Sequence, residues 1–244
     1  MAGDTWRQAT VAGSYLDGRR AHIPYAADQL QTMAELVGWF HPDPRRILDL
    51  GCGDGIAARV LLDRFPAASA VLVDHSGPML ERAQTAMAPY AERVRLVQAD
   101  LSGALPSAAT KAQPDVIVSA YVIHHLPDER KQSLYAECFT ALAPGGVFVN
   151  VEHVASATPE LEALFDDGYC RNVAARTGRP FDEVLREYVT RPDRRDNLLT
   201  AVETQLDWLR DSGFAHVDCY FKWMELAVFG GVRPASLTPT MERH

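Results

Sequence analysis

Residues 48–55, with the sequence LDLGCGDG, constrain the fold more than any other part of the chain. A short apolar run, 46–50, predicts a buried strand that ends directly in this glycine-rich turn, and a helical pattern follows over 57–65. Glycine lets the backbone turn tightly and approach a ligand closely. The spacing is G-x-G-x-G, and Ile56 stands where the dinucleotide fingerprint G-x-G-x-x-G has its third glycine. The turn therefore predicts a ligand site that differs from a nicotinamide site.

Short β-rich runs alternate with helical patterns along most of the chain. Further strands are predicted at 70–74, 94–97, 114–118 and 147–151. Helices are predicted at 30–40, 78–88, 128–142 and 200–212. The strands are apolar throughout, which is typical of parallel strands buried on both faces. Two last strands, 217–223 and 226–229, lie too close together for a crossover helix and are expected to be antiparallel. The pattern predicts an α/β fold with helices on both faces of the sheet.

The alternation stops between residues 154 and 198. This segment has helical patterns at 161–176 and 181–188, followed by a charged run at 191–196. We expect a helical insertion that caps the site of a single domain covering 1–244. Residues 1–44, which come before the first strand, are expected to form an N-terminal helical lid.

Acidic residues follow the ends of three predicted strands. Asp49 ends the first strand, Asp74 ends the second, and Asp100 comes just after the third. In open α/β sheets, ligands bind beyond the carboxyl ends of the strands, where the strand order reverses. The three carboxylates are therefore expected to converge on one edge of the sheet.

The turn and these acids resemble the class I methyltransferases that depend on S-adenosylmethionine (SAM). DLGCGDG is similar to the first motif of that family, and the segments 119–126 and 144–146 match later motifs in order. The resemblance covers about 45–152 closely and the final strand pair in topology. It implies a Rossmann-like, seven-stranded, mostly parallel sheet with an antiparallel terminal hairpin. It also implies that SAM is the cofactor and that the protein is a methyltransferase.

The resemblance further implies a set of cofactor contacts. The acid at Asp74 would accept bonds from ribose hydroxyls, Asp100 would contact the adenine amino group, and Asp49 would lie near the methionine end. In related enzymes a segment such as 13–25 folds over SAM as a lid, although ordinary helix packing is the alternative. The expected cofactor-binding residues are Tyr15, Arg20, Asp49, Gly51, Gly53, Asp74, His75, Met79, Asp100, Leu101, Ser119 and His124.

A general base is needed only where the methyl acceptor must first lose a proton. The candidates are His124, His125 and His153, and the alternative for His125 is that it caps or packs a helix start. These histidines and Glu152 lack the tight spacing of metal ligands, so no metal is expected. The expected substrate contacts are Tyr121 and Glu152 at strand ends, with Tyr169, Arg171 and Tyr188 from the insertion. Arginines of the insertion are candidates to select an anionic substrate, or they are solvated helix residues.

The composition restricts the partners. A formal net charge of -8 argues against a broad nucleic-acid surface, so a small-molecule substrate is expected and nucleic acid is not. Four scattered cysteines without a CxxC pair indicate neither zinc nor disulfides. No signal-peptide stretch is recognisable, and no apolar run approaches the roughly 18 residues of a membrane span, so a cytoplasmic protein without a membrane partner is expected. The oligomeric state is left open, with a homodimer among the alternatives.

The function expected first is methyl transfer from SAM to an oxygen or nitrogen atom of a small molecule. One alternative is an enzyme like carboxy-SAM synthase, which acts in tRNA wobble-uridine modification and is similar in the N-terminal segment and the His-His-Leu motif. The long insertion, and the lack of that family's arginine-and-tyrosine pattern, depart from it. A non-catalytic SAM-binding partner subunit is the other alternative, and the intact acids argue against it. The glycine spacing and the hairpin argue against a nicotinamide oxidoreductase.

Overall fold

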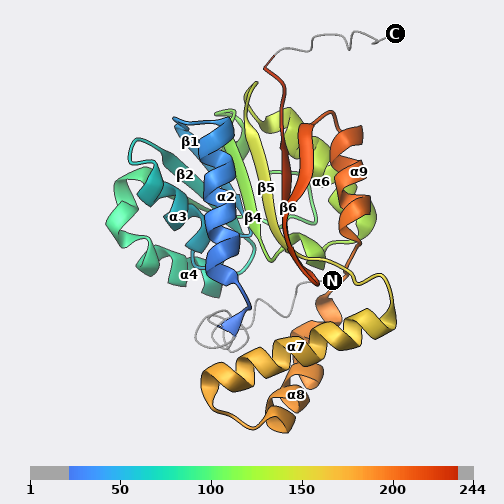
Figure 1. Cartoon of the computed structure of the whole chain (residues 1–244). Coiled ribbons are helices and arrows are strands. Elements are labelled where there is room, and N and C mark those ends of the chain that lie inside the picture. Colours follow the sequence, from blue (N-terminus) through green and yellow to red (C-terminus); the bar gives the residue numbers. More distant parts are fainter. Residues whose placement is uncertain (1–21, 236–244) are drawn as a thin grey trace, which may run out of the picture.

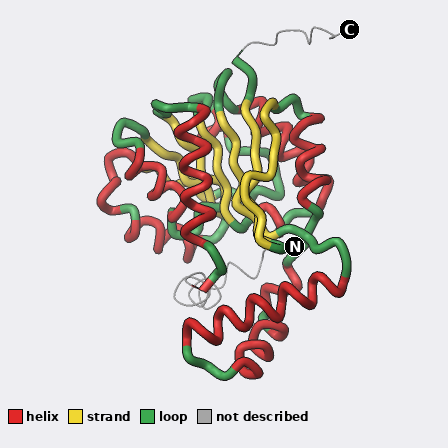
Figure 2. Tube along the Cα trace, in the orientation of Figure 1, coloured by secondary structure: helices red, strands yellow, loops and turns green. Residues whose placement is uncertain are grey.

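Seven strands form one sheet in the order β3-β2-β1-β4-β5-β7-β6 in the computed structural model, which describes residues 22–235 (Figures 1 and 2). The strands are β1 (Arg46–Leu50), β2 (Ser69–Asp74), β3 (Val94–Gln98), β4 (Val116–Ala120), β5 (Val147–His153), β6 (Ala215–Trp223) and β7 (Leu226–Val232). Strands β1 to β5 pair in parallel, whereas β7 runs antiparallel to both β5 and β6. The predicted mostly parallel, Rossmann-like sheet with an antiparallel terminal hairpin is confirmed.

The helices follow the predicted pattern with shifted ends. They are α2 (Ala26–Phe40), α3 (Ile56–Arg64), α4 (Gly77–Ala86), α5 (Ser107–Thr110), α6 (Asp128–Ala141), α7 (Pro159–Thr177), α8 (Phe181–Thr190) and α9 (Val202–Asp211). Three short 3-10 helices join them: η3 (Ala88–Arg93), η4 (Ile123–His125) and η5 (Pro192–Asp196). The sequence pattern did not predict α5, because four residues are too few to show a helical period.

Local capping signals set several of these helix ends. The Ser76 side chain accepts a hydrogen bond from Met79 N at the start of α4. The Thr158 side chain accepts from Leu161 N at the start of α7, and Gly178, with φ 71°, ends that helix in the left-handed conformation. These are the residue types that such positions favour, because a short side-chain oxygen satisfies a free amide and glycine tolerates positive φ. The insertion therefore begins and ends its long helix on ordinary local chemistry.

Two apolar layers enclose the sheet, one on each face. Alternate residues of a strand point to opposite faces, so Val116 and Val118 of β4 pack on one side and Ile117 on the other. Helices α2 and α3 cover the first face, and α6 and α9 cover the second (Figure 1). Both faces of the parallel strands are therefore dry, which explains their unbroken apolar sequences.

The strand order determines where a ligand can bind, namely at the carboxyl ends of the parallel strands, here called the functional edge of the sheet. The chain passes from β1 outward to β2 and β3 and then returns to β4 on the other side of β1, so the direction of winding reverses between β1 and β4. Helices α7 and α8 lie beyond the carboxyl ends of the parallel strands (Figure 1). Residues after β1, β2 and β4 therefore face the insertion across this edge.

A buried lysine fixes the point where the insertion returns to the sheet. Lys131 Nζ lies 2.8 Å from Asp128 Oδ1 and 2.6 Å from Thr200 Oγ1, and it also donates to Leu198 O. A buried ammonium is tolerated only when it is paired and hydrogen-bonded, as this one is.

Among the described helices, none is both long and apolar enough to cross a membrane.

Candidate functional site

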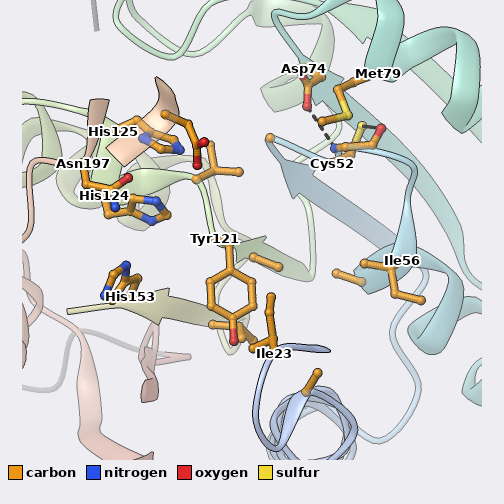
Figure 3. A pocket seen from close by; sticks show the side chains of 18 of the residues that line it. Ile23, Cys52, Ile56, Asp74, Met79, Tyr121, His124, His125, His153 and Asn197 are labelled. Carbon is orange, nitrogen blue, oxygen red and sulfur yellow. Dashed lines mark hydrogen bonds between the residues drawn. The ribbon is translucent and has the colours of Figure 1, made fainter. Parts of the chain in front are cut away.

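A cavity of about 430 Å³ lies at the functional edge of the sheet. Figure 3 shows Asp74, Met79 and Cys52 on one side of it and His124, His125 and His153 on the opposite side. The first side, here called the cofactor half, is lined by Asp49, Gly51, Cys52, Gly53, Asp54, Ile56, Ala57, Asp74, His75, Met79, Asp100 and Leu101. The second side is called the acceptor half, and it draws its lining from α2, the ends of β4 and β5, and the insertion. The cavity thus has two chemically different ends.

The glycine-rich turn is fixed tightly to its neighbours in the cofactor half. Gly51 has φ 70°, and a Cβ atom on it would lie 2.3 Å from Val122 Cγ1, so only glycine fits there. Gly51 N donates to Val73 O at 2.7 Å, and Gly53 N donates to Asp74 Oδ2 at 2.9 Å. By contrast, a Cβ on Gly53 would meet nothing nearer than Met79 Sδ at 4.0 Å, so the turn is open toward the cavity at that residue.

Asp49 carries a buried oxygen that has no partner among residues 22–235. Its Oδ2 accepts a hydrogen bond from Ala58 N at 3.1 Å, whereas Oδ1 is buried and unsatisfied. Burial, together with the negative charges of Asp74 and Asp54, raises the pKa of Asp49 to about 7. A ligand that places a positive charge or a hydrogen-bond donor here would satisfy this oxygen and favour the ionised form.

The remaining polar groups of the cofactor half are also acceptors. Asp74 accepts from Gly53 N and Ser76 N, and a carboxylate retains further lone pairs for ligand hydroxyls. Burial raises the pKa of Asp74 as well. The described residues that line this half include four aspartates but no lysine or arginine that could pair with a pyrophosphate. A cationic nucleoside with free hydroxyls, such as SAM, fits this donor-poor and acid-rich surface.

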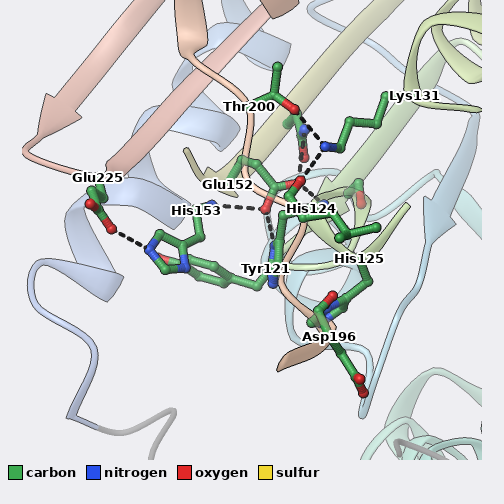
Figure 4. Close-up of polar contacts among 12 residues, drawn as sticks. Tyr121, His124, His125, Lys131, Glu152, His153, Asp196, Thr200 and Glu225 are labelled. Carbon is green, nitrogen blue, oxygen red and sulfur yellow. Dashed lines mark hydrogen bonds and ion pairs between the residues drawn. The ribbon is translucent and has the colours of Figure 1, made fainter. Parts of the chain in front are cut away.

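His153 and Glu225 form a buried pair at the edge of the acceptor half. His153 ends β5, and its Nε2 lies 2.7 Å from Glu225 Oε2 in the turn between β6 and β7 (Figure 4). The Glu225 side chain is 2% exposed, and its other oxygen accepts a hydrogen bond from Ser156. A neutral imidazole in this position donates its Nε2 hydrogen to the carboxylate and keeps a lone pair on Nδ1.

His124 has its own carboxylate partner behind it. His124 Nδ1 lies 2.5 Å from Glu152 Oε1, and Glu152 also accepts hydrogen bonds from His124 N, His153 N and Asn150 Nδ2. Burial lowers the pKa of His124 and raises that of Glu152 to about 7, because desolvation disfavours both charges. Glu152 thus orients His124 from below the cavity.

His125 is held in one tautomer. Its Nδ1 lies 3.0 Å from the backbone oxygen of Asp196, and a carbonyl oxygen can only accept, so Nδ1 carries the hydrogen. Burial lowers the pKa of His125 to about 3. The imidazole is therefore neutral, and its Nε2 is a hydrogen-bond acceptor.

The structure brings together most of the residues that the sequence analysis singled out. Lining the cavity are Asp49, Gly51, Gly53, Asp74, His75, Met79, Asp100, Leu101, Tyr121, His124, His125, His153, Tyr169 and Tyr188. Tyr121 has φ 58°, and its hydroxyl donates to Gln29 Oε1 at 2.6 Å, which ties the cavity floor to α2. Tyr15 and Arg20 lie outside the described residues. Among residues 22–235, no three His, Cys, Asp or Glu side chains are grouped so that they could hold a metal ion.

Three expected contacts do not line the cavity. The Ser119 hydroxyl is fully buried and donates to Leu50 O at 2.8 Å, because Ser119 lies opposite Leu50 where β1 pairs with β4. Glu152 is fully buried behind His124, so it supports an imidazole instead of contacting substrate directly. Arg171 is 67% exposed and pairs with Asp167 one helical turn away. The structure places these three side chains away from the cavity lining, and the ligand contacts expected for them stay predictions.

Other lining residues were not predicted. Glu225, Asp193 and Asn197 bring polar groups to the site or to its histidines, and Ile23 and Leu30 contribute apolar surface from the N-terminal side. Sequence spacing gives no sign of the pair formed by His153 and Glu225, because 72 residues separate its members. The strand register supplies the missing information, since β5 pairs with β7 so that His153 lies opposite Leu226.

Comparison with known proteins agrees with this site. A family model described as a methyltransferase domain matches residues 47–146. The chain is 28% identical over 232 residues to the carboxy-S-adenosyl-L-methionine synthase of Wolinella succinogenes, with 90% of this chain and 89% of that protein covered. It is 36% identical over 107 residues to the trans-aconitate 2-methyltransferase of Acidovorax sp. (strain JS42), with 44% of this chain and 38% of that protein covered.

Solved structures share the fold. The apo form of the SAM-dependent methyltransferase SibL aligns with a TM-score of 0.60 at 24% identity, covering 86% of this chain and 56% of that one. Human N-acetylserotonin methyltransferase in complex with SAM aligns with a TM-score of 0.61 at 15% identity, covering 97% and 60%. The chain therefore spans less than two thirds of the length of these two proteins.

Fold, site and relatives together define the class. The chain has the fold of the class I SAM-dependent methyltransferases, and its residues 47–146 match a methyltransferase domain. The methyltransferase domain indicates an enzyme, and SAM is the cofactor that fits the acid-rich cofactor half.

The affinity for S-adenosylhomocysteine is expected to fall about tenfold when the pH is lowered from 8 to 6. The reason is that protonation of Asp49, with a pKa of about 7, removes the charge that meets the ligand ammonium. Calorimetric titration across this pH range measures the effect. The variant Asp49→Asn, which cannot ionise, should bind weakly and show a flat profile. An affinity of the parent protein that is constant, or that rises toward pH 6, would contradict this role of Asp49.

Proposed function

We propose that the protein transfers the methyl group of SAM to an oxygen or nitrogen atom of a small-molecule acceptor, with His153 as the general base. The observation that carries this proposal is the imidazole of His153 at the cavity, held through Nε2 by the buried carboxylate of Glu225. SAM, when bound, supplies a methyl group on a sulfonium that leaves as a neutral thioether. The protein must then position the acceptor and, for a hydroxyl or a protonated amine, remove its proton.

The pair of His153 and Glu225 suits that proton transfer. Glu225 fixes the tautomer, so Nδ1 of His153 is the nitrogen that takes the proton of the acceptor. The imidazolium that forms stays beside a carboxylate in a water-poor pocket, where the attraction of opposite charges is strong. General-base catalysis of this kind typically contributes between about 100-fold and 10,000-fold to a rate.

The rest of the acceptor half supports positioning and the exclusion of water. Phe165 and Leu226 are buried against the rim, and Ile23 packs with them. His124 and His125 present neutral rings whose centroids lie 4.0 Å apart. A small molecule would displace most of the water in this pocket, and fixed groups would replace that water around the reacting atoms.

The test is an incubation with SAM that is isotopically labelled in its methyl group, together with a panel of phenols, catechols, hydroxy acids and amines. The proposal expects the label in one class of acceptor, together with an equal amount of S-adenosylhomocysteine. A chain that turns SAM over while the label stays on the nucleoside would refute methyl transfer.

A second candidate function is the formation of carboxy-SAM. It is favoured by the similarity to carboxy-S-adenosyl-L-methionine synthases over 90% of the chain, whereas the similarity to the trans-aconitate enzyme covers 44%. In that case the methyl carbon of SAM would lose a proton and gain the carboxyl group of a second substrate, a carboxylic acid that gives up this group. Mass spectrometry of the nucleoside product separates the two functions, because only this second one leaves a heavier nucleoside than SAM.

A further inference from the structure

Of the seven arginines between residues 154 and 198, a single one lines the cavity. Arg191 lines the acceptor half, and no other arginine or lysine among the described residues does so. Arg179 pairs with Glu183 and Glu187, and Arg194 pairs with Glu162 and Asp166. The exposed arginines on the outside of the insertion are Arg171, Arg176, Arg186 and Arg195. Arg191 is therefore the candidate for substrate recognition, whereas the other six arginines pair with acids or are exposed on the outside of the insertion.

Neighbouring residues hold the guanidinium of Arg191 in place, and part of the side chain remains exposed. Its Cζ lies 3.9 Å from the centre of the Tyr188 ring, and its Nη1 donates to Tyr188 O at 3.0 Å. Its Nε lies 3.5 Å from the buried Asp193. The Tyr188 hydroxyl also interacts with the Arg191 side chain, which remains 13% exposed and lines the cavity. One edge of a held cation is therefore available to an acceptor group in the cavity.

The side chain of Asn197 adds a second donor at this end. It lines the cavity close to His125 (Figure 3) and makes no hydrogen bond within the described part of the chain. Arg191 and Asn197 flank the two ends of η5 and both line the cavity, where each can donate to a carboxylate. Asp193 does not occupy that site, because it approaches the guanidinium from the Nε side.

A row of rings connects Arg191 to the general base. The ring centres of His153 and Phe165 lie 5.4 Å apart, those of Phe165 and Tyr169 6.0 Å, and those of Tyr169 and Tyr188 4.8 Å. Arg191 follows Tyr188, and every member of the row lines the cavity. Flat rings at such spacings favour offset or edge contacts with a further ring. The wall between base and cation is therefore built for a planar, apolar body.

We propose that the methyl acceptor is an aromatic acid, with its hydroxyl or amine at His153, its ring against Phe165, Tyr169 and Tyr188, and its carboxylate on Arg191 and Asn197. This assignment rests on the proposed function and names the substrate class for the same site. The anion is selected by the held guanidinium, and the ring is selected by the aromatic row.

The test compares acids with their amides. The full chain, saturated with S-adenosylhomocysteine, is titrated calorimetrically with 4-hydroxybenzoate, 3,4-dihydroxybenzoate, 4-hydroxycinnamate and 4-aminobenzoate, and with the primary amide of each. At least one acid should bind tenfold or more tightly than its amide. Arg191→Met, which keeps the length of the side chain, should abolish that preference and leave the affinity for S-adenosylhomocysteine unchanged. Arg195→Met is the matched control, because Arg195 is an exposed arginine of the same short helix, and it should keep the preference.

Equal binding of every acid and its amide, no binding of any acid, or an unchanged preference in Arg191→Met would overturn the substrate class. Methyl transfer from labelled SAM is measured in parallel. Transfer without an acid preference would leave the proposed function standing and refute the aromatic acid. An acid preference without transfer would support the carboxylate site and refute methyl transfer. Carboxy-SAM that copurifies with the parent protein but not with Arg191→Met would place the carboxylate on the nucleoside and overturn the assignment to the acceptor.

Discussion

Replacing His153 with glutamine is expected to lower kcat for methyl transfer by about 100-fold or more, with the affinity for S-adenosylhomocysteine within about twofold of the parent. Glutamine can still donate a hydrogen bond toward Glu225, which keeps that buried carboxylate partnered. It cannot take a proton from the acceptor, so the chemical step should lose its base while cofactor binding remains.

Two further variants test whether the expected loss of kcat is specific to the imidazole of His153. Glu225→Gln should lower kcat less than His153→Gln does, because the imidazole keeps a hydrogen-bond partner but loses the charge that stabilises its protonated form. His216→Gln is the control, since His216 is an exposed histidine that does not line the cavity. Rapid-quench measurement of a single turnover reports the chemical step directly. If His153→Gln and His216→Gln transfer methyl groups at the same rate, His153 is not the base.

Replacing Asp74 with alanine is expected to weaken S-adenosylhomocysteine binding about 100-fold, or roughly 2.7 kcal/mol. Asp74 has two functions that the substitution removes together. Its oxygens accept from Gly53 N and Ser76 N, which holds the glycine-rich turn against β2. The remaining lone pairs are the acceptors proposed for the ligand hydroxyls, and unmet buried polar groups cost about 1–3 kcal/mol each.

The control for this variant is Asp43→Ala, because Asp43 is exposed and pairs with Arg45 at the surface. Calorimetry should find its affinity for S-adenosylhomocysteine unchanged. Circular dichroism confirms whether Asp74→Ala is folded. A folded Asp74→Ala that binds S-adenosylhomocysteine as tightly as Asp43→Ala would show that the cofactor lies elsewhere.

The sequence was sufficient to predict the sheet and the cofactor half of the site. Motifs such as the glycine-rich turn are local, and each sits directly after a strand, so the parallel arrangement brings Asp49, Asp74 and Asp100 to one edge. The order of the strands and helices alone brings these three aspartates together, whichever way any single side chain is turned.

The acceptor half could not be predicted to the same extent, because it depends on orientation and on distant pairing. Ser119 and Tyr121 are both near the end of β4, but the Ser119 hydroxyl donates to Leu50 of β1 and the Tyr121 hydroxyl donates to Gln29 of α2. Arg171 and Arg191 belong to the same insertion, and only the packing of α7 against α8 decides which one reaches the cavity. Glu225 depends on the pairing of strands far apart in the sequence.

The central claim is that the cavity binds SAM and uses it as a methyl donor. It is tested most directly by mass spectrometry of the nucleoside that copurifies with the full chain, released by mild denaturation and measured against the protein concentration. SAM or S-adenosylhomocysteine is expected in a substantial fraction of the molecules, and Asp74→Ala is expected to lose that ligand. A nicotinamide dinucleotide in place of either would contradict the cofactor, and carboxy-SAM would contradict methyl transfer in favour of the second candidate function.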